Sequence, residues 1–406
     1  CLDHQKNELI KIFKDIGEQG AFIMQQDLKE FEVSLANYTG AKYAVGVANG
    51  TDALELAWMA IDLQAGDEVI ISSHTMLATA SAIKLAGGIP VPVEIGEDGL
   101  IDSDAVEDAI NPRTVGIMPT DLNGRTCDMI SIMAIAKKYG LYVVEDAAQA
   151  FGSKFKGKHA GTFGNAGSIS FYPAKVLGCL GDGGAIITND LNLYDKVYQL
   201  HDHGRDKHGE VKSWGRNSRL DNLQAAILDY KLKYYEQAIE KRRQIASIYE
   251  NQLRDIDDLV LPPGPDSGGE HFDIYQNYEI EADNRDSLKD YLSNKGIGTL
   301  IQWGGKGVHQ FNKLGFDISL PFSEKVFEEL INPDLGNIYI LEISSFQLEF
   351  IDQFRPTICA FLNISPDHLD RYKNIDKYLN MKLKMIKNHK KNDILVYNID
   401  DLVLDK

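Results

Sequence analysis

Seven short apolar runs, separated by segments with helical periodicity, constrain the fold of this chain more than any other feature. They are Tyr43–Val47, Val69–Ile71, Ile89–Val93, Val115–Met118, Leu141–Val144, Ser168–Phe171 and Ala185–Ile187. Strands that alternate with helices are joined by crossovers, which produce a mostly parallel sheet covered on both faces. The pattern therefore predicts an α/β fold whose ligands bind beyond the carboxyl ends of the strands.

The second half of the chain has a different pattern. Residues 219–254 carry one long helical periodicity, continuous or broken, which is typical of a helix that bridges two domains. The Pro- and Gly-rich stretch Leu261–Gly269 is typical of a loop. A strand at Tyr275–Ile280, a helix at Arg285–Asn294 and a strand at Gly296–Gln302 are expected to form a small α+β domain.

Composition excludes several classes of protein. The 406 residues include 42 Lys plus Arg and 60 Asp plus Glu, a formal charge of −18, so no nucleic-acid partner is expected and an anionic ligand needs a local site. No window reaches the roughly 18 to 20 apolar residues of a membrane span. Cys1, Cys127, Cys179 and Cys359 lack both zinc-site and disulfide-framework spacing, which favours free thiols in the cytoplasm and no metal site. A start at Cys1 rather than Met indicates a piece of a longer reading frame.

One helix is expected to begin directly after the first strand, within Gly50–Glu55. Asp52 and Glu55 have the spacing of a capping box, and apolar residues then recur with helical periodicity from Leu54 to Ile61. The unpaired N–H groups of such a helix N-terminus form a natural phosphate site. On its own, the segment fits a well-capped turn at least as well.

Two further segments carry chemically suited side chains. Glu145 and Asp146 end an apolar strand, where a buried carboxylate needs a cation or hydrogen-bond donors. Lys175 follows the strand at 168–171 among apolar residues and glycines, and burial there lowers the pKa of a lysine and frees its amine. An Asp that caps a turn and a Lys on the surface are the plainer alternatives for each segment alone.

Together, the three segments fit one cofactor. A helix N-terminus holds a phosphate, Asp146 pairs with a pyridinium nitrogen and Lys175 reacts with an aldehyde. The combination predicts a site for pyridoxal phosphate (PLP).

A series of motifs then carries a specific resemblance over roughly residues 8–330. The motifs are Phe31-Glu32, Thr39–Ala44, Gly50–Leu54, Gly66–Val69, Glu145–Gln149, Ser170–Lys175, Gly181–Ala185, Asn217–Asp221, Gln224–Leu228 and Leu320–Lys325. In order and spacing they resemble the DegT/DnrJ/StrS family of PLP-dependent sugar aminotransferases, which implies fold type I: a large domain with a mostly parallel sheet and a small α+β domain.

The resemblance implies catalytic roles for two residues. Lys175 matches the lysine that forms the internal aldimine and later moves the proton, and Asp146 matches the aspartate that keeps the ring nitrogen protonated. Gln149 matches the glutamine beside the phenolic oxygen of the cofactor. Met76 stands where the family often has an aromatic residue stacked on the ring, a position that a polarizable thioether also suits.

The resemblance also implies phosphate ligands from two subunits. Gly50, Thr51 and Ser170 match ligands within one chain. Asn217 matches an asparagine that reaches the phosphate of the neighbouring subunit, so a homodimer with shared active sites is expected.

The expected activity is PLP-dependent transamination of a nucleotide-linked keto-sugar, with an amino acid donor, glutamate as in the family, in the biosynthesis of surface polysaccharide or a related glycan. Related sugar dehydratases carry His where this chain has Lys175, which argues against that activity. The alternative is a non-catalytic PLP-binding regulator or a protein inactivated by truncation and fusion. His201, His203, His208 and His271 are expected to be solvated or to face substrate, and Trp303 to line the sugar end of the site or the core.

The last part of the chain has another origin. Ile340–Glu349 and Asn363–Arg371 resemble the central domain of Mur ligases, closest to the enzyme that adds D-glutamate to UDP-N-acetylmuramoyl-alanine. That resemblance implies that Glu342 and His368 match magnesium ligands and Lys382 a carbamylated lysine. The chain lacks the Gly-Lys-Ser/Thr phosphate loop of those ligases, so this segment, about residues 335–406, is expected to be inactive. A joining artefact or broken gene is favoured over a true fusion.

Three domains are therefore expected: a large PLP-binding domain with an N-terminal arm at residues 1–240, a truncated small domain at 241–331 and a non-functional Mur-ligase-like fragment at 332–406. Charge supports the last boundary. Residues 331–406 hold 10 Lys plus Arg and 11 Asp plus Glu, so nearly all of the net charge lies before them.

Overall fold

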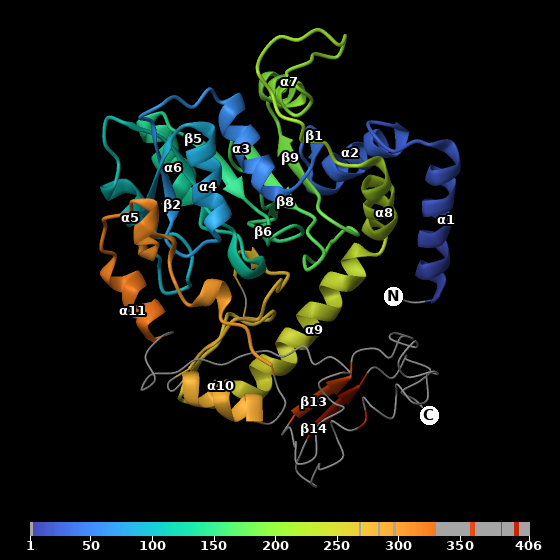
Figure 1. Ribbon diagram of the computed structural model, residues 1–406. Coiled ribbons are helices and arrows are strands. Elements are labelled where there is room, and N and C mark those ends of the chain that lie inside the picture. Colours follow the sequence, from blue (N-terminus) through green and yellow to red (C-terminus); the bar gives the residue numbers. More distant parts are fainter. Residues whose placement is uncertain are drawn as a thin grey trace.

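The fold is built on a seven-stranded sheet (Figure 1). The computed structural model describes residues 3–329, except 268, 283–284 and 295–297, together with 358–361, 383 and 394–397. In the order β1-β9-β8-β5-β4-β2-β3, the sheet contains β1 Tyr43–Val47, β9 Gly184–Thr188, β8 Ala166–Ser170, β5 Tyr142–Asp146, β4 Thr114–Met118, β2 Glu68–Ser72 and β3 Ile89–Val93. All seven predicted strands are confirmed.

The sheet is mostly parallel, as predicted. Strands β3, β2, β4, β5 and β8 pair in parallel, and only β9 runs antiparallel to both of its neighbours, β8 and β1. Six strands therefore point the same way, and their carboxyl ends meet at one edge of the sheet. The amino end of β9 lies at this edge as well.

Helices cover both faces of the sheet, because successive residues of a strand point to opposite sides. Val69, Ile71 and Val144 pack with α3 Gly50–Ala60, α4 Leu77–Ala86 and α7 Leu191–Leu200. Ile70 and Val143 pack with α5 Ser103–Asp108 and α6 Met129–Tyr139. A third apolar cluster joins the strands to α2 Gln26–Thr39, α8 Asn222–Leu232 and the first turns of α9 Tyr235–Leu253.

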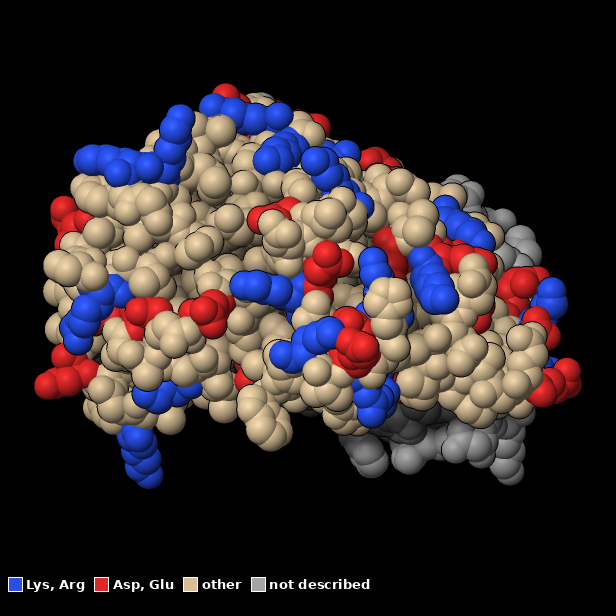
Figure 2. All heavy atoms as spheres, turned by 90° about the horizontal axis from the view of Figure 1, so that it is seen from above, with Lys and Arg blue, Asp and Glu red and all other residues tan. Residues whose placement is uncertain are grey.

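The predicted long helix at 219–254 is present as a broken helix. Helix α8 ends at Leu232, and α9 restarts at Tyr235 and leads away from the sheet (Figure 1). The N-terminal helix α1 Asp3–Gln19 lies against the α8 side of the molecule. The face seen from above carries basic and acidic side chains scattered among uncharged ones (Figure 2), so the negative charge does not gather there in one field.

The region after α9 corrects two predictions. Helix α10 Arg285–Asn294 is present as predicted, and residues 261–267 form the expected loop. The strand predicted at Tyr275–Ile280 is wrong, because Tyr275 has a left-handed backbone (φ 52°) and its neighbours bond to loops of the large sheet. Only the two-residue strands β11 His271–Phe272 and β12 Glu281–Ala282 flank it.

The strand predicted at Gly296–Gln302 is also wrong over its described residues, 298–302. Short helical turns occupy the region instead: η2 Gln302–Gly304, η3 Val308–Gln310 and η4 Asn312–Leu314, before α11 Pro321–Glu329. Trp303 and Gly304 both have positive φ, which turns the chain back before a strand can pair.

The remaining short elements are β6 Lys154–Phe155, β7 Lys158–His159, β10 Leu259–Val260 and η1 Leu122–Gly124. Beyond α11, the described residues include one parallel strand pair, β13 Ile358–Phe361 and β14 Ile394–Tyr397. Cys1, Glu342, His368 and Lys382, for which the sequence predicts roles, lie outside the described residues. None of the helices described is long and apolar enough to cross a bilayer.

Strand β4 packs closely against α3 at Gly116. A Cβ atom added to Gly116 would clash with Cη2 of Trp58, which is completely buried, and would lie 2.8 Å from Cζ3 of the same ring and 2.9 Å from the carbonyl oxygen of Tyr142. We expect Gly116→Ala to lower the free energy of unfolding by about 1 to 3 kcal/mol, measured with urea.

Gly17→Ala in α1 is the matched control, because a Cβ atom there meets nothing within 4 Å. The same substitution should raise stability by about 0.5 to 1 kcal/mol at this helical position. Equal effects of the two substitutions would contradict the packing argument.

Candidate active site

The N-terminus of α3 lies against the ends of β8 and β9. A Cβ atom on Gly50 would lie 2.8 Å from Cβ of Ser170, and one on Gly184 would lie 2.8 Å from the nitrogen of Gly50. The hydroxyl of Ser168 also donates to the carbonyl of Gly50 at 3.1 Å. Only glycine permits backbones to approach this closely, and the result brings Gly50 and Ser170 together as predicted.

The cap of α3 differs from the prediction. Asn49, not Asp52, is the N-cap, and its side chain accepts from the N–H of Asp52 at 2.8 Å. The N–H groups of Gly50 and Thr51 belong to the same first turn, where a helix supplies no carbonyl partner of its own. The predicted helix start and anion site are therefore consistent with the structure, while the capping box is wrong.

Glu55, assigned to that capping box, has another partner. Its buried carboxylate forms an ion pair with Arg216, which precedes Asn217. The next residue, Ser218, accepts from the N–H of Ala48 at 3.2 Å. These contacts fix the 216–218 segment close to the start of α3 and leave Asn217 itself exposed.

Asp146 lies at the end of β5 with only 4% of its surface exposed. Its Oδ2 accepts from the hydroxyl of Thr79 at 2.7 Å, and its Oδ1 accepts from the N–H of Ala148 at 3.2 Å. Burial raises the pKa of Asp146, while these hydrogen bonds and the charge of Lys175 oppose the rise. The carboxylate is therefore costly to ionise by itself and suited to a cationic partner.

Three threonines form a chain of hydroxyl contacts that ends on Asp146. Thr120 contacts Thr75 at 2.8 Å, and Thr75 contacts Thr79 at 2.6 Å. Because Thr79 uses its single proton on Asp146, Thr75 must donate to Thr79, and Thr120 must then donate to Thr75. All three hydroxyl dipoles consequently favour the ionised form of the carboxylate. Sequence reasoning missed these threonines, which become neighbours only where β2, β4 and β5 end together.

Glu145, the neighbouring carboxylate, has a structural role. It is fully buried and accepts from the N–H groups of Gly161, Phe163 and Gly164 at 2.7 to 2.8 Å. Burial raises the pKa of Glu145 to about 7. It faces away from the site because adjacent residues of a strand point to opposite sides.

Lys175 follows β8 in the loop that crosses the same edge. The lysine is half-buried, and burial lowers its pKa, while the charge of Asp146 acts in the opposite direction. Its backbone N–H donates to the carbonyl of Tyr172 at 2.8 Å. This position is the one that the sequence predicts for a desolvated amine.

Gln149 follows Asp146 in the turn after β5. Its Oε1 accepts from the backbone N–H of Asn123 at 2.9 Å. The side-chain amide nitrogen is therefore the end that can donate to a ligand. Met76, at the N-cap of α4, is 54% exposed.

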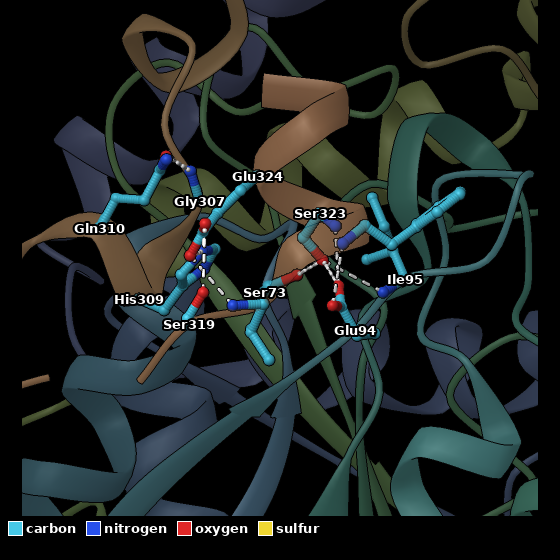
Figure 3. A network of polar contacts seen from close by, with 11 residues as sticks. Ser73, Glu94, Ile95, Gly307, His309, Gln310, Ser319, Ser323 and Glu324 are labelled. Carbon is cyan, nitrogen blue, oxygen red and sulfur yellow. Dashed lines mark hydrogen bonds and ion pairs between the residues drawn. The ribbon is translucent and has the colours of Figure 1, made fainter. Parts of the chain in front are cut away.

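The motif Leu320–Lys325 docks on the far end of this edge (Figure 3). The carboxylate of Glu94 accepts from the N–H groups of Phe322 at 3.0 Å and Ser323 at 2.7 Å, which caps the start of α11. The hydroxyl of Ser323 contacts that of Ser73 at 2.8 Å. The carbonyl of Ser73 accepts from the N–H of Val308, so the 308–323 region is fixed next to the β2 end.

The remaining predicted residues have mixed outcomes. Trp303 packs edge-to-face on His74 and on an apolar cluster, which agrees with a core role. His201 is buried at the end of α7, with Nδ1 facing the carbonyl of Tyr198, so its predicted solvation is wrong. Cys127 and Cys179 are buried free thiols. Within the described residues, no three His, Cys, Asp or Glu side chains converge as a metal site would require.

Comparison with known proteins identifies the family. Residues 3–337 match the DegT/DnrJ/EryC1/StrS aminotransferase family. The chain belongs to this family. A pleiotropic regulatory protein of Geobacillus stearothermophilus is 39% identical over 332 residues, 80% of this chain and 89% of that protein. A UDP-2-acetamido-2-deoxy-3-oxo-D-glucuronate aminotransferase of Pseudomonas aeruginosa is 40% identical over 285 residues, 70% of this chain and 78% of that protein.

Structural comparison agrees with this assignment to the DegT/DnrJ/EryC1/StrS aminotransferases. The crystal structure of S. venezuelae DesV in complex with a ketimine intermediate superposes with a TM-score of 0.77 and 32% identity, over 85% of this chain and 92% of that chain. The predicted α/β fold, enzyme class and PLP cofactor are confirmed at the level of the family.

The predicted second resemblance is confirmed too. Residues 287–406 match the Mur ligase middle domain. This match begins well before the boundary predicted near residue 335, and it overlaps the DegT/DnrJ/EryC1/StrS match over residues 287–337.

The hydrogen bond from Thr79 to Asp146 can be tested by mutation. Thr79→Val removes the side-chain hydroxyl that donates to Asp146, so the pKa of Asp146 should rise further. PLP affinity should fall about tenfold or more at neutral pH, because hydrogen bonds to charged groups contribute about 1.5 to 3 kcal/mol. The affinity is measured by titrating the apoprotein with PLP and following absorbance.

The change of PLP affinity with pH provides a second test of the role of Thr79. Only ionised Asp146 can pair with a protonated ring nitrogen, so affinity is lost as pH falls through the pKa of Asp146. In Thr79→Val this loss should begin at a higher pH, whereas Thr79→Ser should match the wild type. Lys175 and Asp121 also interact electrostatically with Asp146, and both are common to all three proteins. Identical pH profiles for the wild type and Thr79→Val would contradict the assignment.

Proposed function

We propose that this chain is a PLP-dependent aminotransferase that converts a nucleotide-linked keto-sugar to an amino-sugar with an amino acid donor, expected to be glutamate. The observation that supports it best is the pair formed by a desolvated lysine, Lys175, and a buried carboxylate, Asp146, beyond the α3 N-terminus. Surface polysaccharide or a related glycan is the proposed end product.

The residues present fit PLP. Gly50 and Gly184 leave no room for a Cβ atom, and this close approach brings the N–H groups at the positive end of α3 next to Ser170. When bound, PLP supplies an electron sink that lets a proton leave the carbon next to the amino nitrogen.

Residues of this chain would bind the cofactor and transfer the proton. Gly50, Thr51 and Ser170 would hold the phosphate, and Asp146 would hold a proton on the ring nitrogen. Gln149 would donate from its side-chain amide to the phenolic oxygen. Lys175, whose lowered pKa favours the free amine, would take up and return the proton at its Nζ atom in both half-reactions.

The proposed substrate class is inferred from the names of similar proteins. Proteins at 35 to 40% identity carry names that refer to UDP-, dTDP- and GDP-linked sugars or their products. The shared element is a sugar attached to a nucleoside diphosphate, which is the class we propose here.

A regulatory role is the second candidate. The Geobacillus stearothermophilus relative is named a regulatory protein, and another relative a sensory transduction protein. A regulator needs only to bind PLP, whereas an enzyme must also convert substrate to product. Purified protein should transfer amino groups from glutamate to at least one sugar in a panel of UDP-, dTDP- and GDP-linked 3-keto and 4-keto sugars.

Substitution of Lys175 is the control for these activity measurements. Lys175→Ala should lose the visible absorbance of bound PLP and all turnover, because no amine remains to react with the aldehyde. Unchanged absorbance in this variant would contradict the cofactor site. Absorbance that Lys175→Ala abolishes, without turnover on any sugar, would favour the regulator.

We also propose a homodimer in which Asn217 reaches the phosphate of the neighbouring subunit. The support is its exposed position on a segment held by the Arg216–Glu55 ion pair. Asn217→Asp and Lys175→Ala should each be inactive alone. Mixed after unfolding and refolding together, they should recover about a quarter of wild-type activity, because a random mixture restores one site in half of the dimers. No recovery would contradict shared sites.

Two further proposals concern the chain as a whole. A cytoplasmic location is supported by the free thiols of Cys127 and Cys179, since reducing compartments keep thiols unpaired. The proposed domains are residues 1–240, 241–331 and 332–406, the last without ligase activity because the sequence has no Gly-Lys-Ser/Thr loop. Sequencing genomic DNA across codons 325–345 tests whether an artefact joins the two parts.

A further inference from the structure

Gln276 brackets the proposed catalytic lysine. Its side-chain Oε1 accepts from the backbone N–H of Val176 at 2.9 Å, and its Nε2 donates to the backbone carbonyl of Ala174 at 2.9 Å. One amide therefore binds the residue before and the residue after Lys175, although it lies 100 residues away in the chain. We propose that Gln276 is a positioning residue that fixes the backbone on both sides of Lys175 and thereby the place of its amine.

The chemistry of the bracket requires an amide. One end must accept from an N–H group and the other must donate to a carbonyl, and glutamine provides one acceptor and two donors on a planar group. A glutamate in the same place would still accept from Val176 but would face the carbonyl of Ala174 with a second oxygen. A leucine would bind neither.

The backbone around Gln276 is fixed by hydrogen bonds from another element. Arg242, on α9, donates to the carbonyls of Tyr275 at 3.0 Å and Gln276 at 3.3 Å. Tyr275 is buried with a left-handed backbone, and its hydroxyl donates to the carbonyl of Pro263 at 2.6 Å. A left-handed tyrosine costs free energy that the surrounding contacts must offset, and such conformations concentrate at functional sites.

The next residue reaches a second part of the site. Asn277 donates through its backbone to the carbonyl of Asn123 at 3.4 Å and through its side chain to Oδ1 of Asn123 at 2.9 Å. Asn123 in turn donates to Gln149. Residues 276–277 thus contact both the loop that carries Lys175 and the Asn123 loop, which binds Gln149.

Gln224 offers a matched control. Its side chain makes the same pair of bonds to a single residue farther along the loop, accepting from the N–H of Leu180 at 2.7 Å and donating to its carbonyl at 3.1 Å. Gln224→Leu removes an equivalent amide clamp without touching the residues that flank Lys175.

The first experiment uses the full-length apoprotein and does not depend on turnover. Hydrogen exchange at the Val176 amide should be at least about tenfold faster in Gln276→Leu than in the wild type, because its hydrogen bond is lost. Gln224→Leu should leave exchange at Val176 within about twofold of the wild type. Unchanged exchange in Gln276→Leu, or an equal rise in Gln224→Leu, overturns the proposal.

The second experiment separates positioning from general stability. PLP is added, its bond to Lys175 is trapped with borohydride, and the adduct is measured by mass as a function of pH. In Gln276→Leu and Gln276→Glu the trapping rate should fall about tenfold and its pH midpoint should shift, with Asp146 as the charged neighbour of the amine in every variant. A wild-type rate and midpoint in both variants overturns the proposal, even if urea unfolding shows lower stability.

This inference rests on the proposed role of Lys175, and the two can fail separately. Absence of an adduct in the wild-type protein refutes the proposed function. A wild-type adduct that the Gln276 variants form equally well refutes only the bracket.

Discussion

A buried carboxylate is the constraint on which the rest of this structure depends. Asp146 ends β5 at 4% exposure, where an ionised group is costly unless its surroundings are arranged for it. The parallel sheet brings three threonine hydroxyls and Lys175 to the same edge, and each of them favours the charged form. The carboxylate is in turn suited to a cationic ring, so the cost of its burial in the fold becomes part of the proposed chemistry.

The second requirement is to hold an anion in a chain with a formal charge of −18. Bulk electrostatics opposes this, so the attraction must be local. Gly50, Ser170 and Gly184 let the start of α3 approach two strand ends, which concentrates N–H groups and hydroxyls at one point. The lysine loop is fixed from outside the sheet by Gln276. The proposed phosphate site and the lysine loop thus depend on different parts of the chain.

Much of this was readable from the sequence. All seven sheet strands were predicted because parallel strands buried on both faces are continuous apolar runs. Gly50, Asp146 and Lys175 were predicted because each follows such a run, whereas Ser170 was implied by the family resemblance. Two of the failures have a similar cause: Tyr275–Ile280 resembles a strand and Glu55 a capping residue, but Arg242 and Arg216, distant in sequence, bind these segments instead.

The sequence by itself determined the order of strands and helices in the large sheet, the family, and which residue types stand at the carboxyl edge of that sheet. These follow from local periodicity and motif spacing. Only the tertiary structure decided which side chains meet there. Thr75, Thr79 and Thr120 form a chain of hydroxyl hydrogen bonds, and Gln276 binds the backbone on both sides of Lys175. Such hydrogen bonds depend on distances that sequence separation does not encode.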